Sequence, residues 1–295
     1  MTVVGDQQSR DNIGVLKRKA SSQALYSNPP AHNARLIVTF SQTVTLVDTL
    51  ARFHLKGESR QYFLGYLWWV LEPLLYVGVF YLVFEILLDS RQPDFLYFLM
   101  VGKLTFIWFS KSVNQAASSL EANKGLMAQT HLRKELFPLA VIQQGFYRQL
   151  VVFLFLIGFL LMGGYPPSAA WLWLIPLTLL QAMLIAACGL LGALLVSFKR
   201  DFRLLIQLGM VFLLFMSGIF WDLNVIADTH LRDGLLVLNP LANLIDCYRQ
   251  VLMQGEAPSG VRLAWVFGES MLLLSIVWVA YRRLQYWIAR QVVTR

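Results

Sequence analysis

The stretch from Trp171 to Phe198 reads WLWLIPLTLLQAMLIAACGLLGALLVSF and contains no charged residue. An α-helix needs about 20 apolar residues of this kind to cross the roughly 30 Å hydrocarbon core of a membrane. Because lipid offers the peptide group no hydrogen-bond partner, a segment that crosses it has to be helical. The stretch therefore predicts an all-α membrane protein.

Five further apolar runs accompany this stretch, and the composition agrees with them. Of 295 residues, 57% are hydrophobic and only 14% are charged, whereas a soluble domain has about a quarter of its residues charged. All nine tryptophans lie near the ends of the runs, where an indole meets the lipid headgroups. The expected spans are 67–88, 94–112, 138–162, 171–198, 202–221 and 261–282.

The basic residues are distributed unevenly between the two sides of these spans. One side holds the N-terminal region, the loops after spans two and four and the C-terminal tail, and it has 18 Lys and Arg residues against four on the other side. Cytoplasmic loops carry such an excess. We therefore expect a multi-pass protein of the cell inner (cytoplasmic) membrane with both termini in the cytoplasm. Membrane lipid accounts for the net charge of +8 without any nucleic acid partner.

The same pattern divides the chain into four segments. Residues 1–35 are expected to form a flexible cytoplasmic tail, 36–60 an amphipathic interfacial helix, 61–288 the six-span domain and 289–295 a second cytoplasmic tail. Within the helix, Gln42–Lys56 gathers its polar residues on one arc, which is typical of a helix lying flat in the membrane surface. An amphipathic helix packed on protein would show the same pattern.

Two connections between spans are long enough to have structure of their own. Ser112–Phe137 is charged and long for a cytoplasmic connection, so it is either a docking surface for a soluble partner or a solvated loop. Asp222–Gly260 lies on the external side and has short apolar pieces around Asn239–Pro240. It is expected to form a helical hairpin that re-enters the membrane between spans five and six.

The sequence contains no constellation that predicts catalysis. The phosphate-binding motif G-x-x-x-x-G-K-[ST] is missing, and so are the common zinc and nucleophile motifs. The two cysteines and four histidines are scattered without metal-ligand spacing. We expect no catalytic residues, no metal and no cofactor in this chain.

Ionisable residues inside the expected spans are costly and therefore informative. Judged by depth, Glu72 and Arg148 would form one ion pair, and Lys103 and Glu269 a second. Alternatively these groups line a polar cavity. The intramembrane charges are Glu72, Glu85, Lys103, Arg148 and Glu269.

An aromatic stripe runs along one face of span one, and span five adds further rings. Such stripes commonly pack against neighbouring helices. A second interpretation is a slide for sugar rings, whose C–H faces can lie on aromatic rings without a fixed hydrogen bond. The candidate channel residues are Tyr62, Tyr66, Trp69, Tyr76, Phe80, Phe212, Phe215 and Phe220, with Phe84 continuing the stripe.

Four stretches together resemble a known family. They are Tyr62–Pro73 (YFLGYLWWVLEP), Ser119–Leu126 (SLEANKGL) followed by Phe137-Pro138, Arg200-Asp201-Phe202 with Ser217–Phe220 (SGIF), and Leu238–Leu241 (LNPL) with Arg249 downstream. In order and spacing they resemble the type-2 ABC exporter permeases for capsule, O-antigen and teichoic-acid chains, over about 36–285.

The resemblance implies a homodimer that works with two copies of an ABC ATP-binding subunit and moves a lipid-linked polysaccharide. ATP and Mg would be bound by that partner subunit. It places ATPase coupling on the segment after span two, here Glu121, Asn123, Lys124, Arg133 and Lys134. It places the point where the substrate headgroup enters on the interfacial helix, here Arg52, Lys56 and Arg60. Spans one and five would line the channel.

Three other functions stay open at this point. A related permease for a drug or a simple lipid would share the topology. A membrane-embedded enzyme of glycan or lipid assembly would need a reactive acidic or histidine pair. A structural membrane protein would need no partner at all.

Overall fold

The computed structural model describes residues 40–61, 63–87, 94–129 and 132–294. The chain divides into the units Met1–Thr43 and Val44–Arg295. Of the first unit only Phe40–Thr43, the start of the first described helix, is described, so the expected tail 1–35 lies outside the described residues. Within the described ranges every regular element is helical, which confirms the predicted all-α membrane fold.

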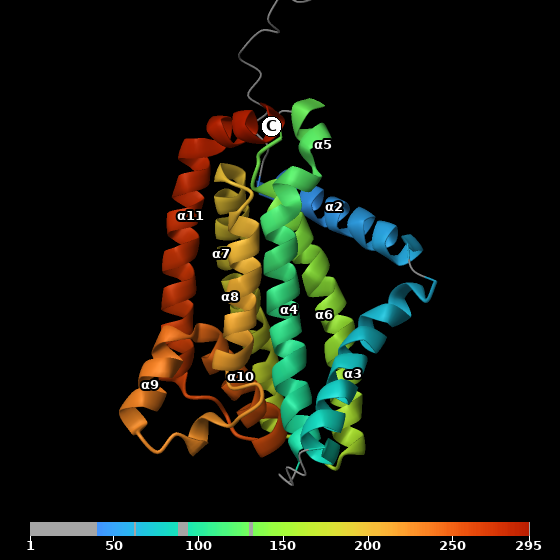
Figure 1. Ribbon diagram of the computed structural model, residues 1–295, viewed down its shortest axis with the longest axis vertical. Coiled ribbons are helices and arrows are strands. Elements are labelled where there is room, and N and C mark those ends of the chain that lie inside the picture. Colours follow the sequence, from blue (N-terminus) through green and yellow to red (C-terminus); the bar gives the residue numbers. More distant parts are fainter. Residues whose placement is uncertain (1–39, 62, 88–93, 130–131, 295) are drawn as a thin grey trace, which may run out of the picture. The chain divides into compact units, whose positions relative to one another are not determined.

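The helices differ widely in length (Figure 1). They are α2 (Phe40–Gln61), α3 (Trp68–Tyr81), α4 (Phe95–Ala122), α5 (Lys124–Gln129), α6 (Leu136–Met162), α7 (Leu174–Phe198), α8 (Phe202–Met216), α9 (Thr229–Leu238), α10 (Pro240–Arg249) and α11 (Gly260–Thr294). The short 3₁₀- and π-helical segments are η1 (Gly65–Leu67), η2 (Leu82–Leu87), η3 (Ala169–Trp173), η4 (Leu223–Val225) and η5 (Gln250–Gln254).

Among the described residues, five helical segments are long and apolar enough to cross a membrane. They are Gly65–Phe84, Phe95–Ala122, Leu136–Met162, Ala169–Phe198 and Gly260–Leu284. The predicted fifth span, 202–221, is shorter than expected, because α8 has 15 residues and its chain turns at Gly218, where φ is +66°. A helix of that length rises only about 22 Å. The number of six spans therefore stays a prediction.

The second span is longer than predicted. It was expected to end at residue 112, but α4 continues to Ala122, where the Asn123 side-chain amide donates to the Ser119 carbonyl oxygen at 2.8 Å. The residues between are polar, yet they include no glycine or proline, and Ala, Gln, Leu and Glu are good helix formers. The charged connection that follows is thus shorter and contains α5. We call this end of the bundle the α5 end and the opposite end the α9 end.

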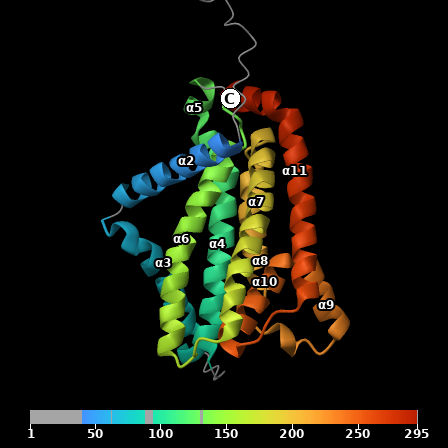
Figure 2. The same cartoon turned by 180° about the vertical axis from the view of Figure 1, so that it is seen from behind.

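Helix α4 is the central element of the second unit. It lies between α6 and α7, and α11 packs on the far side of α7 (Figures 1 and 2). Gly189 and Gly192 of α7 face Ala116 and Ala117 of α4, so closely that a Cβ at Gly189 would lie 3.0 Å from the Ala116 methyl group. Small residues allow two membrane helices to approach in this way.

We predict that Gly189→Leu lowers the free energy of unfolding by about 2 kcal/mol or more, since the side chain has no room beside Ala116 and Ile142. Gly158→Leu is the matched control, because Gly158 is also in mid-helix but has no atom near its Cβ position. The measurement is thermal unfolding of the detergent-purified protein by size-exclusion chromatography. An equal loss in both variants would contradict the packing explanation.

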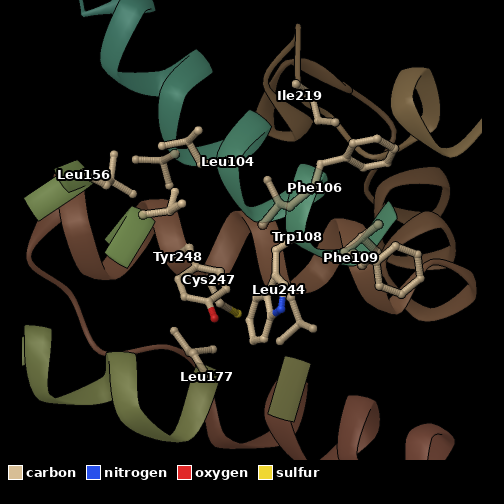
Figure 3. Packing of buried hydrophobic residues seen from close by; sticks show 14 of the residues in the cluster. Leu104, Phe106, Trp108, Phe109, Leu156, Leu177, Ile219, Leu244, Cys247 and Tyr248 are labelled. Carbon is tan, nitrogen blue, oxygen red and sulfur yellow. The ribbon is translucent and has the colours of Figure 1, made fainter. Parts of the chain in front are cut away.

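The segment after α8 forms two helices that meet at Asn239. Its side-chain oxygen accepts from the Ala242 N–H at 3.1 Å and Pro240 occupies the first turn, which is why α10 begins there. Every residue of α10 from Leu241 to Arg249 is buried. Figure 3 shows Tyr248 and Cys247 of α10 beside Leu177 of α7 in this core. The membrane depth of the α9–α10 pair stays a prediction.

Candidate translocation path

The aromatic face of α3 is largely uncovered by the rest of the chain. Tyr66 and Tyr76 are about half exposed, while Trp69 is buried and meets the Tyr66 ring edge-on with centroids 4.7 Å apart. The Lys103 ammonium of α4 lies 5.6 Å from the centroid of the Tyr76 ring. Tyr62 and the side chain of Phe80 lie outside the described residues. The described rings therefore form an open face beside α4.

The aromatic residues of α8 form a second open face. Phe212 and Phe215 are exposed at 62% and 59%, and only Met210 of this helix is buried. At the α9 end, Phe220 packs on Phe215 and stacks on Phe84 of η2, both at 5.7 Å between centroids. Phe84 also contacts Phe95 of α4. We call Phe84, Phe95, Phe215 and Phe220 the phenyl cluster; it joins the two aromatic faces.

Between these two faces, α4 presents polar groups that the sequence interpretation missed. Its residues 101–106 are buried, but toward the α5 end six residues that share an arc of about 100° are partly exposed. They are Ile107, Ser110, Lys111, Asn114, Ser118 and Glu121. Their spacing indicates one helical face, but the face crosses the predicted end of the second span at residue 112, so half of it falls in the predicted connection. We call these six residues the polar face of α4.

The polar face is bordered on both sides by ion pairs. Lys111 pairs with Glu72 of α3, and Glu121 accepts from Arg200, which precedes α8, at 2.7 Å. The Asn114 and Ser118 side chains donate to carbonyl oxygens of α4 itself. Hydroxyl and amide oxygens on this face keep lone pairs for further hydrogen bonds.

Helix α2 is held to α6 mainly through two carboxylates. Asp48 accepts a hydrogen bond from the Tyr147 hydroxyl, and Glu58 accepts from Gln144 at 2.7 Å and from Arg148 at 3.0 Å. The Tyr147 hydroxyl and the Arg52 guanidinium hold the pKa of the Asp48 carboxyl below its ordinary value. The contact is therefore present at neutral pH and is lost only as the pH falls through that lowered pKa.

The three basic residues predicted to receive a substrate headgroup all lie on the exposed side of α2. Arg52 also pairs with Asp48 one turn earlier, at 2.8 Å. The apolar side chains of Val44 and Phe53 of α2 are exposed as well. Headgroup binding by Arg52, Lys56 and Arg60 stays a prediction.

The intramembrane charges are paired differently from the prediction. Glu72 pairs with Lys111 rather than Arg148, because Lys111 lies within α4, which packs beside α3. Arg148 pairs with Glu58 and lies 5.9 Å from the Trp69 ring.

The second predicted pair, Lys103 with Glu269, is not among the described ion pairs. Helix α7 separates α11, which carries Glu269, from α4, which carries Lys103 (Figures 1 and 2). Lys103 instead lies beside the Tyr76 and Phe106 rings. Nothing is described for the Glu85 side chain.

A small cavity lies where α3, α4 and α6 meet. Glu72 and Trp69 of α3, Trp108 and Lys111 of α4, and Arg148 and Gln149 of α6 line it. The predicted partners Glu72 and Arg148 thus share a polar cavity, which was the alternative to direct pairing.

At the α5 end, the residues predicted to couple to an ATPase are mostly engaged within the chain. Glu121 pairs with Arg200, and Arg133 pairs with Glu135 at 2.6 Å while stacking over Trp278. Lys134 is buried, and burial lowers the pKa of its ammonium group. Asn123 ends α4 and Lys124 begins α5. Most of α5 itself is exposed.

At the α9 end, the buried side chain of Arg249 connects three elements. Its guanidinium donates to the carbonyl oxygens of Gly218 at 2.6 Å, Ile219 at 3.1 Å and Phe98 at 3.3 Å. It lies 3.3 Å from the Phe98 ring centroid and against Gly102. Arg249 thus fixes the bend after α8 to α4 and α10.

These features define the class of protein. Residues 45–253, more than half of the chain, match the family model described as "ABC-2 type transporter". The chain belongs to this family of membrane-spanning transporter subunits.

Similar proteins of known name cover most of the chain. The O-antigen export system permease protein RfbA of Myxococcus xanthus is 27% identical over 241 residues, which cover 81% of this chain and 92% of that protein. RfbA of Klebsiella pneumoniae is 27% identical over 211 residues, covering 71% and 81%. The polysialic acid transport protein KpsM of Escherichia coli is 25% identical over 245 residues, covering 82% and 93%.

Proposed function

We propose that this chain is the permease subunit of an ABC exporter that moves a polysaccharide across the cytoplasmic membrane. The observation that carries the proposal is the polar face of α4 between the exposed aromatic faces of α3 and α8. A sugar ring has apolar C–H faces and a rim of hydroxyl groups, so it suits aromatic walls beside a polar floor. The names of the relatives, which refer to O-antigen and polysialic acid, support this substrate class.

The assembly that fits these surfaces is a homodimer with two copies of a separate ATP-binding subunit. Exposed apolar side chains on α3 and α8 leave two faces for a second copy. Because polar groups facing lipid are costly, the polar face of α4 is better placed in a wet path between two copies. The α5 end, with the basic loops, would face the cytoplasm and the ATPase.

The proposed transport cycle uses the two ends of the bundle differently. A lipid-linked glycan enters at the α5 end, beside α2. ATP binding closes the ATPase dimer, and α5, which is exposed, transmits this movement to α4. The phenyl cluster then opens and the glycan moves outward over the aromatic faces. Coupling requires only that ATP favour one conformation of the permease over the other.

We predict that Phe215→Ala and Tyr76→Ala each reduce export at least fivefold, because each removes a ring from the path while the exposed site leaves no cavity in the core. Surface polysaccharide is measured after each variant replaces the native gene in a deletion strain, at matched protein levels.

The matched control is Leu179→Ala, which removes an exposed apolar side chain from α7, outside the aromatic faces. Unchanged export in both aromatic variants would refute the path. Normal polysaccharide export in the deletion strain itself would refute the function.

A further inference from the structure

Three buried N–H donors around the cavity between α3, α4 and α6 have no acceptor among the described residues. They are Trp108 Nε1, Arg148 Nε and Gln149 Nε2, and the three residues are only 4%, 7% and 4% exposed. A buried donor without an acceptor costs free energy, and native proteins contain few of them. Three at one cavity indicate that an acceptor from outside the chain completes the site.

The cavity has room for a small group of atoms. The space open to the centre of a water molecule is about 30 Å³, where one water molecule needs about 10–15 Å³. This is enough for two oxygen atoms of one phosphate group. The donor nitrogens are sealed from solvent, so a ligand has to bring its oxygen atoms in with a shift of the lining side chains.

The chemistry of the lining favours an oxyanion. Each of the three unmet groups is a donor, and the cavity is also lined by the cations Lys111 and Arg148, which pair with the carboxylates Glu72 and Glu58. A phosphate oxygen only accepts, and it makes stronger hydrogen bonds because it is charged.

The position of the cavity favours a lipid as the carrier of this oxyanion. Arg148 contacts both the cavity and Glu58 of α2, so the cavity lies at the level of the interfacial helix. Helix α3, which lines the cavity with Trp69, Glu72 and Pro73, also has the exposed apolar side chains Leu75 and Val79, along which an acyl or isoprenoid chain can lie. The site thus offers a polar pocket beside an apolar track.

We propose that this cavity binds the phosphate group of a lipid, with Trp108, Arg148 and Gln149 donating to its oxygen atoms. The incoming phosphate competes with Glu58 for Arg148, so binding loosens the contact between α2 and α6. The lipid is either a membrane phospholipid or an isoprenoid diphosphate that carries the substrate. The assignment differs from the basic residues of α2 predicted from the sequence.

The test measures binding of radiolabelled farnesyl diphosphate to the detergent-purified full chain. Trp108→Phe and Gln149→Leu each remove one donor and are expected to weaken binding about tenfold. Without ligand, both variants should melt at the same or a higher temperature, because an unpaired donor is lost. Glu58→Gln should strengthen binding, since it removes the competing charge. Trp173→Phe, at an exposed indole away from the cavity, is the control and should bind normally.

Competing ligands identify the source of the phosphate. Displacement by short-chain phosphatidylglycerol assigns the site to phospholipids, and resistance to it assigns the site to diphosphate lipids. Equal binding of farnesol, or displacement by inorganic pyrophosphate at the same concentration, would overturn the lipid-phosphate site.

The variants supply the remaining outcomes. Unchanged affinity in both donor variants would overturn the proposal, and a lower melting temperature with unchanged affinity would assign the three donors to structural water instead. No polysaccharide takes part, so this proposal and the export function can fail separately.

Discussion

Replacing Arg249 with methionine is expected to destabilise the protein by about 3 kcal/mol or more, enough to remove most folded protein from the membrane. The guanidinium supplies donors to the carbonyl oxygens of Phe98, Gly218 and Ile219. Methionine fills much of the space but removes the donors to the carbonyl oxygens of Gly218 and Ile219 at the bend, and each buried acceptor left unpaired costs about 1–3 kcal/mol. The measurement is the yield of monodisperse protein in detergent, followed by its thermal unfolding.

Two further variants separate the hydrogen bonds of Arg249 from its charge and its packing. Arg249→Lys keeps the charge but cannot reach three acceptors with a planar fork, so it should restore only part of the loss. Gly102→Ala places a Cβ 2.5 Å from Arg249 Nη2 and should cost about 1–3 kcal/mol. Arg232→Met is the control, since the ion pair described for Arg232 is with its neighbour Asp233. An Arg249→Met protein as stable as this control would disprove the role.

The second large effect concerns the contact between α2 and α6. Arg148→Glu places a third carboxylate beside Glu58 and Glu72, so like charges repel each other. The site is nearly closed to solvent, since the native side chain of residue 148 is only 9% exposed. Breaking a buried pair costs about 3–5 kcal/mol. We expect thermal unfolding and protease cleavage after α2 to show this loss.

The exchanged pair, Glu58→Arg with Arg148→Glu, should recover at least half of the stability, because the opposite charges face each other again. Arg52→Glu is the matched control: Arg52 and Asp48 form an exposed pair on α2, for which about 1 kcal/mol or less is expected. Failure of the exchange to recover any stability would mean that residues 58 and 148 are not partners.

The sequence predicted the fold where one physical cause dominates. The uncharged run at 171–198 forms η3 and α7. In lipid, a single segment can pair its own backbone N–H and C=O groups only as a helix. The ends of α4 and α8 were misplaced for two reasons. Hydropathy marks where a helix leaves lipid, not where it ends, so α4 continues through polar residues to Ala122. The turn at Gly218 depends on Arg249, which is distant in sequence.

The sequence predicted many of the residues of the candidate site but not which of them contact one another. The aromatic stripes follow from helical spacing, and the exposed rings of Tyr66, Tyr76, Phe212 and Phe215 lie on the faces of two helices. The contact of Phe84 with Phe220 could not be predicted, because no local pattern relates span one to span five. The depth of a residue in the membrane also could not identify the ion-pair partners of Glu72 and Arg148, since several charged residues lie at similar depth.

The phenyl cluster has a consequence for the idle transporter. A passage wide enough for a hydrated polymer would also let protons and small ions leak between rounds of transport, which would discharge the membrane potential. Protons cross a protein along chains of water, and the rings of the phenyl cluster, which contact one another in the order Phe95, Phe84, Phe220, Phe215, offer water no polar partner. In the proposed exporter, the contacts of Phe84, Phe95, Phe215 and Phe220 therefore insulate the cell whenever no glycan is passing.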